Sequence, residues 1–193
     1  QTMELIKNLK EVSLIKNLLL AILGTILLAI SAKIKIPFWP VPMTMQTFVV
    51  LFLGVSLGWK LALFTVGLYL LEGIAGIPVF AGTPEKGIGI IYFLGPTMGY
   101  LVGFLIAAFL TGYLKFYDWT KKEGSSFALF SINFIKLIVS VSVIYLLGVL
   151  WLSKFTGWDN VFTLGVKPFL LAELFKVSLL SFLIPVILKF RKL

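Results

Sequence analysis

The sequence predicts an all-α membrane protein, a compact bundle of six transmembrane helices that forms one domain over residues 1–193. Of the 193 residues, 60% are hydrophobic and 13% are charged, and the charged share is about half that of a soluble domain. A soluble fold of this length would expose much of that apolar surface to water. Long apolar stretches also recur between short polar connections, as in a multi-pass membrane protein.

The predicted spans are the apolar stretches that approach the length of a membrane-crossing helix, roughly 20 residues. They cover residues 14–32, 43–58, 60–77, 90–114, 127–152 and 169–189. The second stretch is short and begins with polar side chains, and the turn at Gly58–Trp59 separates it from the third. Lysines before the first stretch give it the outline of a signal peptide. No convincing cleavage site follows, so we expect a retained helix.

Positive charge is unequally divided between the two sides of this predicted bundle. Ten lysines and arginines lie on the side of both termini, and five lie in the loops of the other side. Because cytoplasmic segments carry the excess of Lys and Arg, both termini are expected in the cytoplasm. The net charge of +9 is thereby assigned to membrane topology, and no nucleic-acid partner is expected.

The predicted outward loops are rich in proline, glycine and aromatic residues. They read IPFWPVP, IPVFAGTPEKGIG and KFTGWDNVFTLGVKP. The segment 78–89 has prolines and glycines around Glu85 and Lys86, which exclude a helix. It also carries apolar Val79 and Phe80, which a free polar turn would lack. We expect a folded loop that packs over the outer end of the bundle, as a lid or as part of a binding site.

Two charged residues lie near the start of the last apolar stretch, in GVKPFLLAELFK. Glu173 and Lys176 are three residues apart, so both project from one helix face, and Pro168 suits the first turn of that helix. Two interpretations stay open. The pair could anchor the helix end, or it could face the bundle interior and hold a polar ligand, since ionisable groups inside membranes usually mark functional sites.

A polar cluster opens the second stretch, in PVPMTMQTF. Thr44, Gln46 and Thr47 lie at its outer end, and Thr44 and Thr47 would share a helical face. If Pro42 begins the helix, its first turn offers unpaired backbone N–H groups to an anion or a carbonyl oxygen.

Aromatic and hydroxyl side chains open the fourth stretch, in YFLGPTMGYLVGF. The residues concerned are Tyr92, Phe93, Thr97 and Tyr100. They suit the wall of a binding site, and they equally suit an interfacial aromatic belt.

Small residues recur every fourth position in the first stretch, at Ala21, Thr25 and Ala29. Such a stripe lets another helix approach closely. It predicts either packing within the bundle or a docking face for a separate protein.

The sequence also excludes several kinds of chemistry. It contains no cysteine and no histidine, and no cluster of metal ligands, nucleotide-binding loop or nucleophile beside a base is visible. We therefore expect no enzyme, no metal and no cofactor. A membrane enzyme such as a lipid-modifying transferase would need one of those motifs. Active transport would take its energy from a partner or from an ion gradient.

The motif-bearing stretches together resemble the BioY family, the biotin-binding S components of energy-coupling-factor (ECF) transporters. The resemblance runs in order from about residue 20 to 190, and its motifs include P-V-P-x-T-x-Q-T, P-V-F-A-G and G-P-T-x-G-Y. It implies an S-component fold of six helices, with biotin bound near the outer face under the long loops. Location in the prokaryotic cytoplasmic membrane follows from the same resemblance.

The resemblance further implies partners. These are biotin, membrane lipid, a transmembrane coupling protein and two ABC ATPases, with the stripe at Ala21, Thr25 and Ala29 as the candidate docking face. Some members of the family work without the ECF partners, and a solitary transporter of that kind would be a candidate homo-oligomer. An S component for another vitamin is the alternative function.

The resemblance also assigns roles to individual residues. Lys176 matches the lysine of the family's last helix, and Glu173 stands where the family usually has aspartate. A carboxylate there would accept from the ureido N–H groups of biotin, whereas Lys176 would reach the ureido carbonyl or the valerate, and this choice stays open. Other implied contacts, around the thioether ring and in the loops, come from Thr44, Gln46, Glu85, Tyr92, Phe93, Thr97 and Tyr100.

Overall fold

The computed structural model describes residues 2–36, 39–121 and 125–191, with side chains from residue 11 onward. Its elements, in chain order, are α1 (Thr2–Lys33), β1 (Lys35–Ile36), β2 (Met43–Thr44), α2 (Gln46–Leu57), α3 (Trp59–Ile74), α4 (Gly89–Phe93), α5 (Met98–Tyr113), α6 (Ser126–Thr156), α7 (Trp158–Gly165), the 3₁₀ turn η1 (Lys167–Phe169) and α8 (Leu170–Arg191). Two predictions fall partly outside the described residues. The first outward loop includes residues 37–38. The charge count includes Lys122, Lys192 and the side chains of Lys7 and Lys10.

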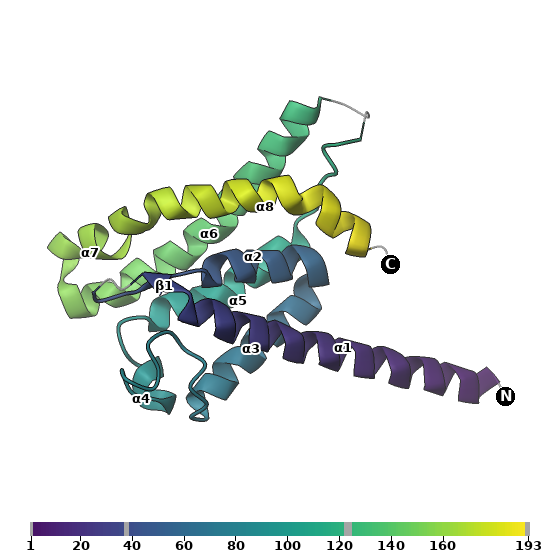
Figure 1. Cartoon of the computed structure of the whole chain (residues 1–193), viewed down its shortest axis with the longest axis horizontal. Coiled ribbons are helices and arrows are strands. Elements are labelled where there is room, and N and C mark those ends of the chain that lie inside the picture. Colours follow the sequence, from purple (N-terminus) through teal and green to yellow (C-terminus); the bar gives the residue numbers. More distant parts are fainter. Residues whose placement is uncertain (1, 37–38, 122–124, 192–193) are drawn as a thin grey trace.

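The longer helices run between two ends of the molecule, and α1 and α8 point in opposite directions (Figure 1). One end carries both chain termini. The other carries the β1–β2 pair, α4 and α7 (Figure 1). Helix α5 is central, since it packs against α2, α3 and α6.

Three helical segments are long and apolar enough to cross a membrane: Glu11–Lys33, Ser126–Thr156 and Trp158–Arg191. Helices α2 and α5 are apolar but shorter. Large apolar side chains such as Leu18, Leu146 and Phe182 are exposed along α1, α6 and α8. An apolar surface of that extent is typical of contact with lipid.

Glycines allow α5 to lie very close to its neighbours. A Cβ atom at Gly103 would lie 2.7 Å from Cα of Ile144 on α6, and one at Gly54 on α2 would lie 1.8 Å from Oγ1 of Thr111 on α5. Small residues at helix contacts drive packing in lipid, where the hydrophobic effect does not. The two contacts hold α2 and α6 on either side of α5, and both helices contribute to the cavity described below.

The small-residue stripe of α1 is an internal packing face. Ala21 and Thr25 are buried, and Ala29 is half-buried against the core. Between them, a Cβ atom at Gly24 would lie 2.4 Å from Cγ2 of Thr65, which shows how closely α1 lies on α3. Of the two alternatives, packing within the bundle agrees with this burial, and docking of a partner on the stripe stays a prediction. A repeat of small residues does not reveal which helix covers it.

The prediction of one continuous fourth helix over residues 90–114 is wrong. This segment is divided into α4 and α5 by a turn at residues 94–97. Pro96 has no N–H group with which to continue the helix, and it disfavours helical geometry at Gly95. The N–H of Gly95 bonds to the carbonyl of Tyr92, and its own carbonyl accepts from Nε1 of Trp151. The turn orients α4 separately from α5.

The start of the second predicted helix, residues 43–58, is also wrong. Met43 and Thr44 form β2, which pairs antiparallel with β1, so Lys35 faces Thr44. Helix α2 begins at Gln46, and Pro42 does not open it. The strand pairing satisfies backbone groups that the predicted helical turn would have left unpaired.

The loop before α4 is folded, as predicted. Phe80 is 1% exposed and stacks on Tyr92 with 5.2 Å between ring centroids. The ammonium of Lys33, at the end of α1, donates to the carbonyls of Phe80 (3.1 Å) and Thr83 (2.7 Å). These bonds hold the loop against the end of the bundle that lies away from the termini.

Candidate ligand-binding site

A cavity lies between α2, α5, α6 and α8, at the end that carries the loops. Its volume is about 50 Å³, well below the roughly 300–1,000 Å³ of small-molecule pockets, so a ligand of that size would have to widen it. Most of its wall is apolar, from side chains such as Val41, Phe104 and Ile144. Its polar side chains are Thr44, Gln46, Thr47, Tyr92, Thr97, Tyr100, Tyr145 and Glu173.

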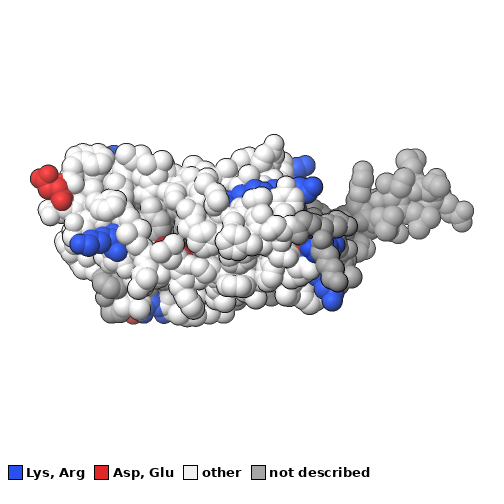
Figure 2. Space-filling view, turned by 90° about the horizontal axis from the view of Figure 1, so that it is seen from above, with Lys and Arg blue, Asp and Glu red and all other residues white. Residues whose placement is uncertain are grey.

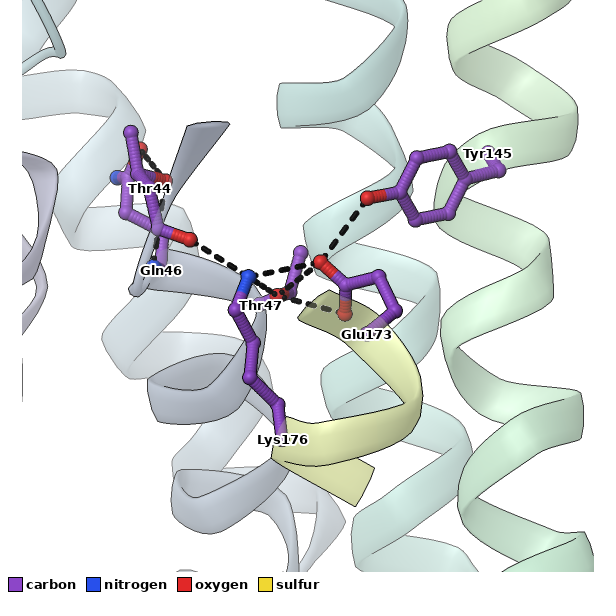
Figure 3. Close-up of polar contacts among 6 residues, drawn as sticks. All are labelled: Thr44, Gln46, Thr47, Tyr145, Glu173 and Lys176. Carbon is purple, nitrogen blue, oxygen red and sulfur yellow. Dashed lines mark hydrogen bonds and ion pairs between the residues drawn. The ribbon is translucent and has the colours of Figure 1, made fainter. Parts of the chain in front are cut away.

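Glu173 and Lys176 form a buried ion pair beside this cavity. They are 6% and 4% exposed, and Nζ of Lys176 lies 2.8 Å from Oε1 of Glu173. Lys176 also donates to Oγ1 of Thr47 (3.0 Å) and to the carbonyl of Thr44 (2.7 Å), as Figure 3 shows. The three N–H bonds of the ammonium thus each have an acceptor.

The start of α8 places this pair. Pro168 lies in the 3₁₀ turn η1, where its missing N–H costs no helical hydrogen bond, and α8 follows from Leu170. The predicted common face of Glu173 and Lys176 is confirmed by their contact at i and i+3. The two residues pair with each other and also face the bundle interior, and their predicted role in holding a ligand stays a prediction.

Two further hydroxyl groups hold the Glu173 carboxylate. Oγ1 of Thr47 on α2 lies 2.9 Å from each carboxylate oxygen, and the hydroxyl of Tyr145 on α6 donates to Oε1 over 2.9 Å (Figure 3). Among the described residues, Oε1 has three partners, whereas Oε2 has Thr47 alone. A carboxylate oxygen can accept two hydrogen bonds, so Oε2 retains capacity on a group that lines the cavity.

A second polar chain connects the cavity to the folded loop. Nε2 of Gln46 donates to the hydroxyl of Tyr69 (2.6 Å), which donates to the carbonyl of Val79 (2.9 Å). Oγ1 of Thr44 accepts from the backbone N–H of Gln46 over 3.2 Å. Gln46 is therefore fixed at the cavity wall, and its amide has one further N–H to donate.

The tyrosines predicted at the fourth stretch line the cavity with their rings. The hydroxyl of Tyr92 donates to the carbonyl of Ala81, and that of Tyr100 donates to the carbonyl of Gly165 over 2.8 Å. The rings of Tyr100 and Tyr145 meet edge to face at 5.8 Å. The hydroxyls tie the surrounding loops together, so the rings are held as a rigid aromatic wall.

Three predicted residues do not line the cavity. Lys176 lies behind Glu173 and Thr47, and its contact to a ligand would pass through them. Phe93 packs against Phe80, at 6.3 Å between ring centroids. Glu85 is exposed on the surface of the loop, away from the cavity wall.

The prediction missed the contribution of α6 to the site. Tyr145, Ile144 and the neighbouring Phe169 line the cavity, and Tyr145 bonds directly to the carboxylate. The signal available in the sequence was a phenol hydroxyl in the middle of an otherwise apolar span. Thr47 was noted as part of the polar cluster, but its bond to Glu173 joins residues 126 positions apart.

Within the described ranges, no group of three or more acidic, histidine or cysteine side chains could hold an ion. The lysine beside Glu173 occupies the place where a cation would lie. The cavity wall thus offers both hydrogen-bond acceptors and hydrogen-bond donors, from Glu173 and Gln46 among others.

Several known proteins are similar to this chain in sequence. The model of the BioY family matches residues 4–192. The chain belongs to the BioY family. A probable biotin transporter BioY from Pyrococcus horikoshii is 36% identical over 169 residues, covering 88% of this chain and 90% of the relative. The biotin transporter BioY of Thermotoga maritima is 36% identical over 163 residues, covering 84% and 89%.

A solved structure shares the fold of this BioY-family chain. It is the S-component for biotin from an ECF-type ABC transporter, with a TM-score of 0.72 and 25% sequence identity. The match covers 92% of this chain and 93% of that one. The helical arrangement around the cavity is therefore that of an S component.

Proposed function

We propose that this chain is a high-affinity biotin-binding membrane subunit for biotin uptake across the cytoplasmic membrane of a prokaryote. The observation that carries the proposal is the buried carboxylate of Glu173 at the wall of a largely apolar cavity. Relatives named as biotin transporters and the biotin S-component of the same fold support it.

The chemistry of biotin matches the cavity wall. Its ureido ring has two N–H donors and one carbonyl, its thioether ring is apolar, and its valerate chain ends in a carboxylate. We assign the ureido N–H groups to Glu173, whose Oε2 has acceptor capacity, and the ureido carbonyl to the remaining N–H of Gln46. Tyr92 and Tyr100 would flank the thioether ring.

Lys176 acts in this proposal as a positioning residue. Its ammonium already donates to Thr44, Thr47 and Glu173, so it keeps the Glu173 carboxylate oriented without reaching the valerate. Thr47 and Tyr145 fix the same carboxylate from two other helices. An analogue that lacks an N–H donor would leave a buried acceptor unpaired and would bind far more weakly.

The remaining predicted contacts differ in their place relative to the cavity. Thr44 and Thr97 line the cavity and would contact the ligand. Phe93 would act through Phe80, against which it packs. Glu85 stays a prediction, and it would need movement of the loop to reach the cavity.

We also propose the membrane arrangement and the partners. The chain would form one membrane domain in which α1, α2, α3, α5, α6 and α8 cross the bilayer and both termini lie in the cytoplasm. The location of both termini at one end supports this (Figure 1). By likeness to the ECF-type S-component, the chain would assemble with a transmembrane coupling protein and two ABC ATPases. In a member without those partners, a homo-oligomer would take their place.

Calorimetric titration of the detergent-purified chain with biotin tests the proposal, with desthiobiotin and thiamine as controls. One tight site for biotin and none for thiamine is the expected result. Asp159→Ala, which removes an exposed carboxylate at the same end, should leave the affinity unchanged, and Glu173→Ala should abolish binding. Tight binding of thiamine, or no heat with biotin from folded protein, would show an S component for another vitamin.

A further inference from the structure

The end of the molecule that carries both termini has a groove built by the α5–α6 connection. Residues 115–121 lie across the start of α6 and the end of α8, and the groove is lined by Lys115, Tyr117, Lys121, Leu129, Pro185 and Lys189. It lies at the opposite end from the candidate site, so it has no part in the function proposed above (Figure 1).

The connection is held rigidly on α6. Asn133 is fully buried, its Oδ1 accepts from the backbone N–H of Tyr117 (3.0 Å), and its Nδ2 donates to the carbonyl of Tyr117 (2.7 Å). The ammonium of Lys136 donates to the carbonyl of Lys115 and lies 4.5 Å from the ring centroid of Tyr117. The groove wall is thus fixed by paired hydrogen bonds.

The connection is also held on α8, at a proline inside the helix. Pro185 has no N–H group, so the carbonyl of Ser181 lacks its usual partner four residues on. Nε1 of Trp119 donates to that carbonyl over 3.0 Å. The indole therefore supplies the missing donor to the backbone of α8 and ties the connection to that helix.

In the part of the chain that the structure describes, the lysines of the groove are not paired with a carboxylate. Lys115, Lys121 and Lys189 are exposed, and none has an ion pair within the described ranges. Asp118, the acidic residue of the groove, accepts through Oδ1 from the N–H and the hydroxyl of Thr120. Figure 2 shows lysine and arginine side chains on the right-hand part of this face and an almost wholly uncharged middle.

The surroundings of the lysines are apolar. Leu129, Pro185 and Val186 line the groove, and Val186 is half exposed on the lipid-facing side of α8. A ligand here meets cations at the membrane surface and apolar side chains just below it. Phospholipids with an anionic headgroup have this division between charge and acyl chain, and basic pockets between helices bind such headgroups.

We propose that this groove binds one anionic phospholipid, with the headgroup phosphate among Lys115, Lys121 and Lys189 and an acyl chain along Leu129 and Val186. Each lysine near the membrane surface contributes about fivefold to the affinity for anionic lipid. Replacing all three lysines should therefore lower the affinity for anionic lipid by at least roughly tenfold, even if their contributions are not fully additive.

Native mass spectrometry of the full chain in detergent micelles, titrated with phosphatidylglycerol or phosphatidylcholine, tests this. We expect preferential retention of phosphatidylglycerol by the wild type, and loss of the preference in Lys115→Gln/Lys121→Gln/Lys189→Gln. The matched control Lys86→Gln/Lys154→Gln/Lys167→Gln removes the same charge at the other end and should keep it. If the first triple variant does not fold, Lys121→Gln on the exposed connection replaces it, with about a fivefold loss expected.

Three outcomes would overturn the proposal. Equal retention of both lipids by the wild type would show that the groove does not select the headgroup, and would leave the lysines to an acidic protein segment. An equal loss in both triple variants would show a general effect of net charge. Full competition by glycerol 1-phosphate would show a site for a free anion.

Discussion

The two ends of this molecule hold charge in different ways. At the loop-bearing end, Glu173 and Lys176 are buried and paired, and every N–H of the ammonium has an acceptor. At the end of the termini, Lys115, Lys121 and Lys189 are exposed and lack ion pairs among the described residues. Buried charge must be satisfied by the protein itself, whereas exposed charge is left to water, lipid headgroups or partners. The first arrangement suits a selective ligand site, and the second suits an adaptable surface.

The largest expected effect comes from breaking the buried pair. Glu173→Ala leaves the Lys176 ammonium buried without its counter-charge, which typically costs about 3–5 kcal/mol in free energy of unfolding. Unfolding in mixed micelles with increasing dodecyl sulfate would measure it. Glu85→Ala, which removes an exposed carboxylate, is the matched control. A similar loss in both variants would contradict the contrast between the two ends.

A smaller stability effect is expected when both members of the pair are removed. Glu173→Gln/Lys176→Met leaves no uncompensated charge, so part of the stability lost in each single variant should return, with a coupling of about 1–3 kcal/mol in a double-mutant cycle. Biotin binding should be weakened in this double variant, because a neutral amide oxygen replaces the carboxylate as the ureido acceptor. Additive losses in stability would show that the two residues do not act as a pair.

Single hydrogen bonds at the site allow a finer comparison. Tyr145→Phe removes a donor to the charged Glu173 and should lower the free energy of unfolding by about 1.5–3 kcal/mol. Tyr100→Phe removes a donor to the neutral carbonyl of Gly165, for which about 1 kcal/mol is expected. The same unfolding assay measures both. A larger loss of stability in Tyr100→Phe than in Tyr145→Phe would argue against a charged carboxylate at the site.

Lys33, which anchors the folded loop, holds its charge in a way that lies between those of the two ends. Lys33 is exposed, yet its ammonium donates to the carbonyls of Phe80 and Thr83. Lys33→Met should loosen the loop and speed biotin dissociation by several-fold, with little change in the association rate. Stopped-flow exchange of labelled biotin would measure it. Lys35→Met on the neighbouring strand is the control, and equal dissociation rates in both would refute the anchoring role.

The smallest effect is expected at the exposed end. Lys121→Gln in micelles of uncharged lipid should change the free energy of unfolding by less than about 0.5 kcal/mol, since surface charges without a partner contribute little. Chemical unfolding in phosphatidylcholine micelles would measure it. A loss as large as that of Tyr145→Phe would place Lys121 in an internal contact.

Local patterns predicted those parts of the fold and site that depend on neighbouring residues. The spacing of Glu173 and Lys176 gave their common face, and the composition of segment 78–89 gave a folded loop. The same patterns could not supply partners from distant helices. The bond from Tyr145 to Glu173 spans 28 residues, and the bond from Lys33 to Thr83 spans 50.

The spacing of small and apolar residues along a helix also did not reveal which other helices it packs against. The stripe at Ala21 and Thr25 could have met any helix, and in the structure it meets α3 of the same chain. The break before α5 was signalled by Pro96, but a hydropathy pattern that continued on both sides outweighed it.

The most direct test of the account compares two ligands on two proteins. Calorimetry would give the affinities of the wild type and of folded Glu173→Gln for biotin and for a biotin methylated on one ureido nitrogen. The account predicts that the wild type prefers biotin by roughly 100-fold or more, since a buried carboxylate oxygen would lose its donor, and that Glu173→Gln loses most of this preference. An unchanged preference in Glu173→Gln would show that the ureido ring is recognised elsewhere.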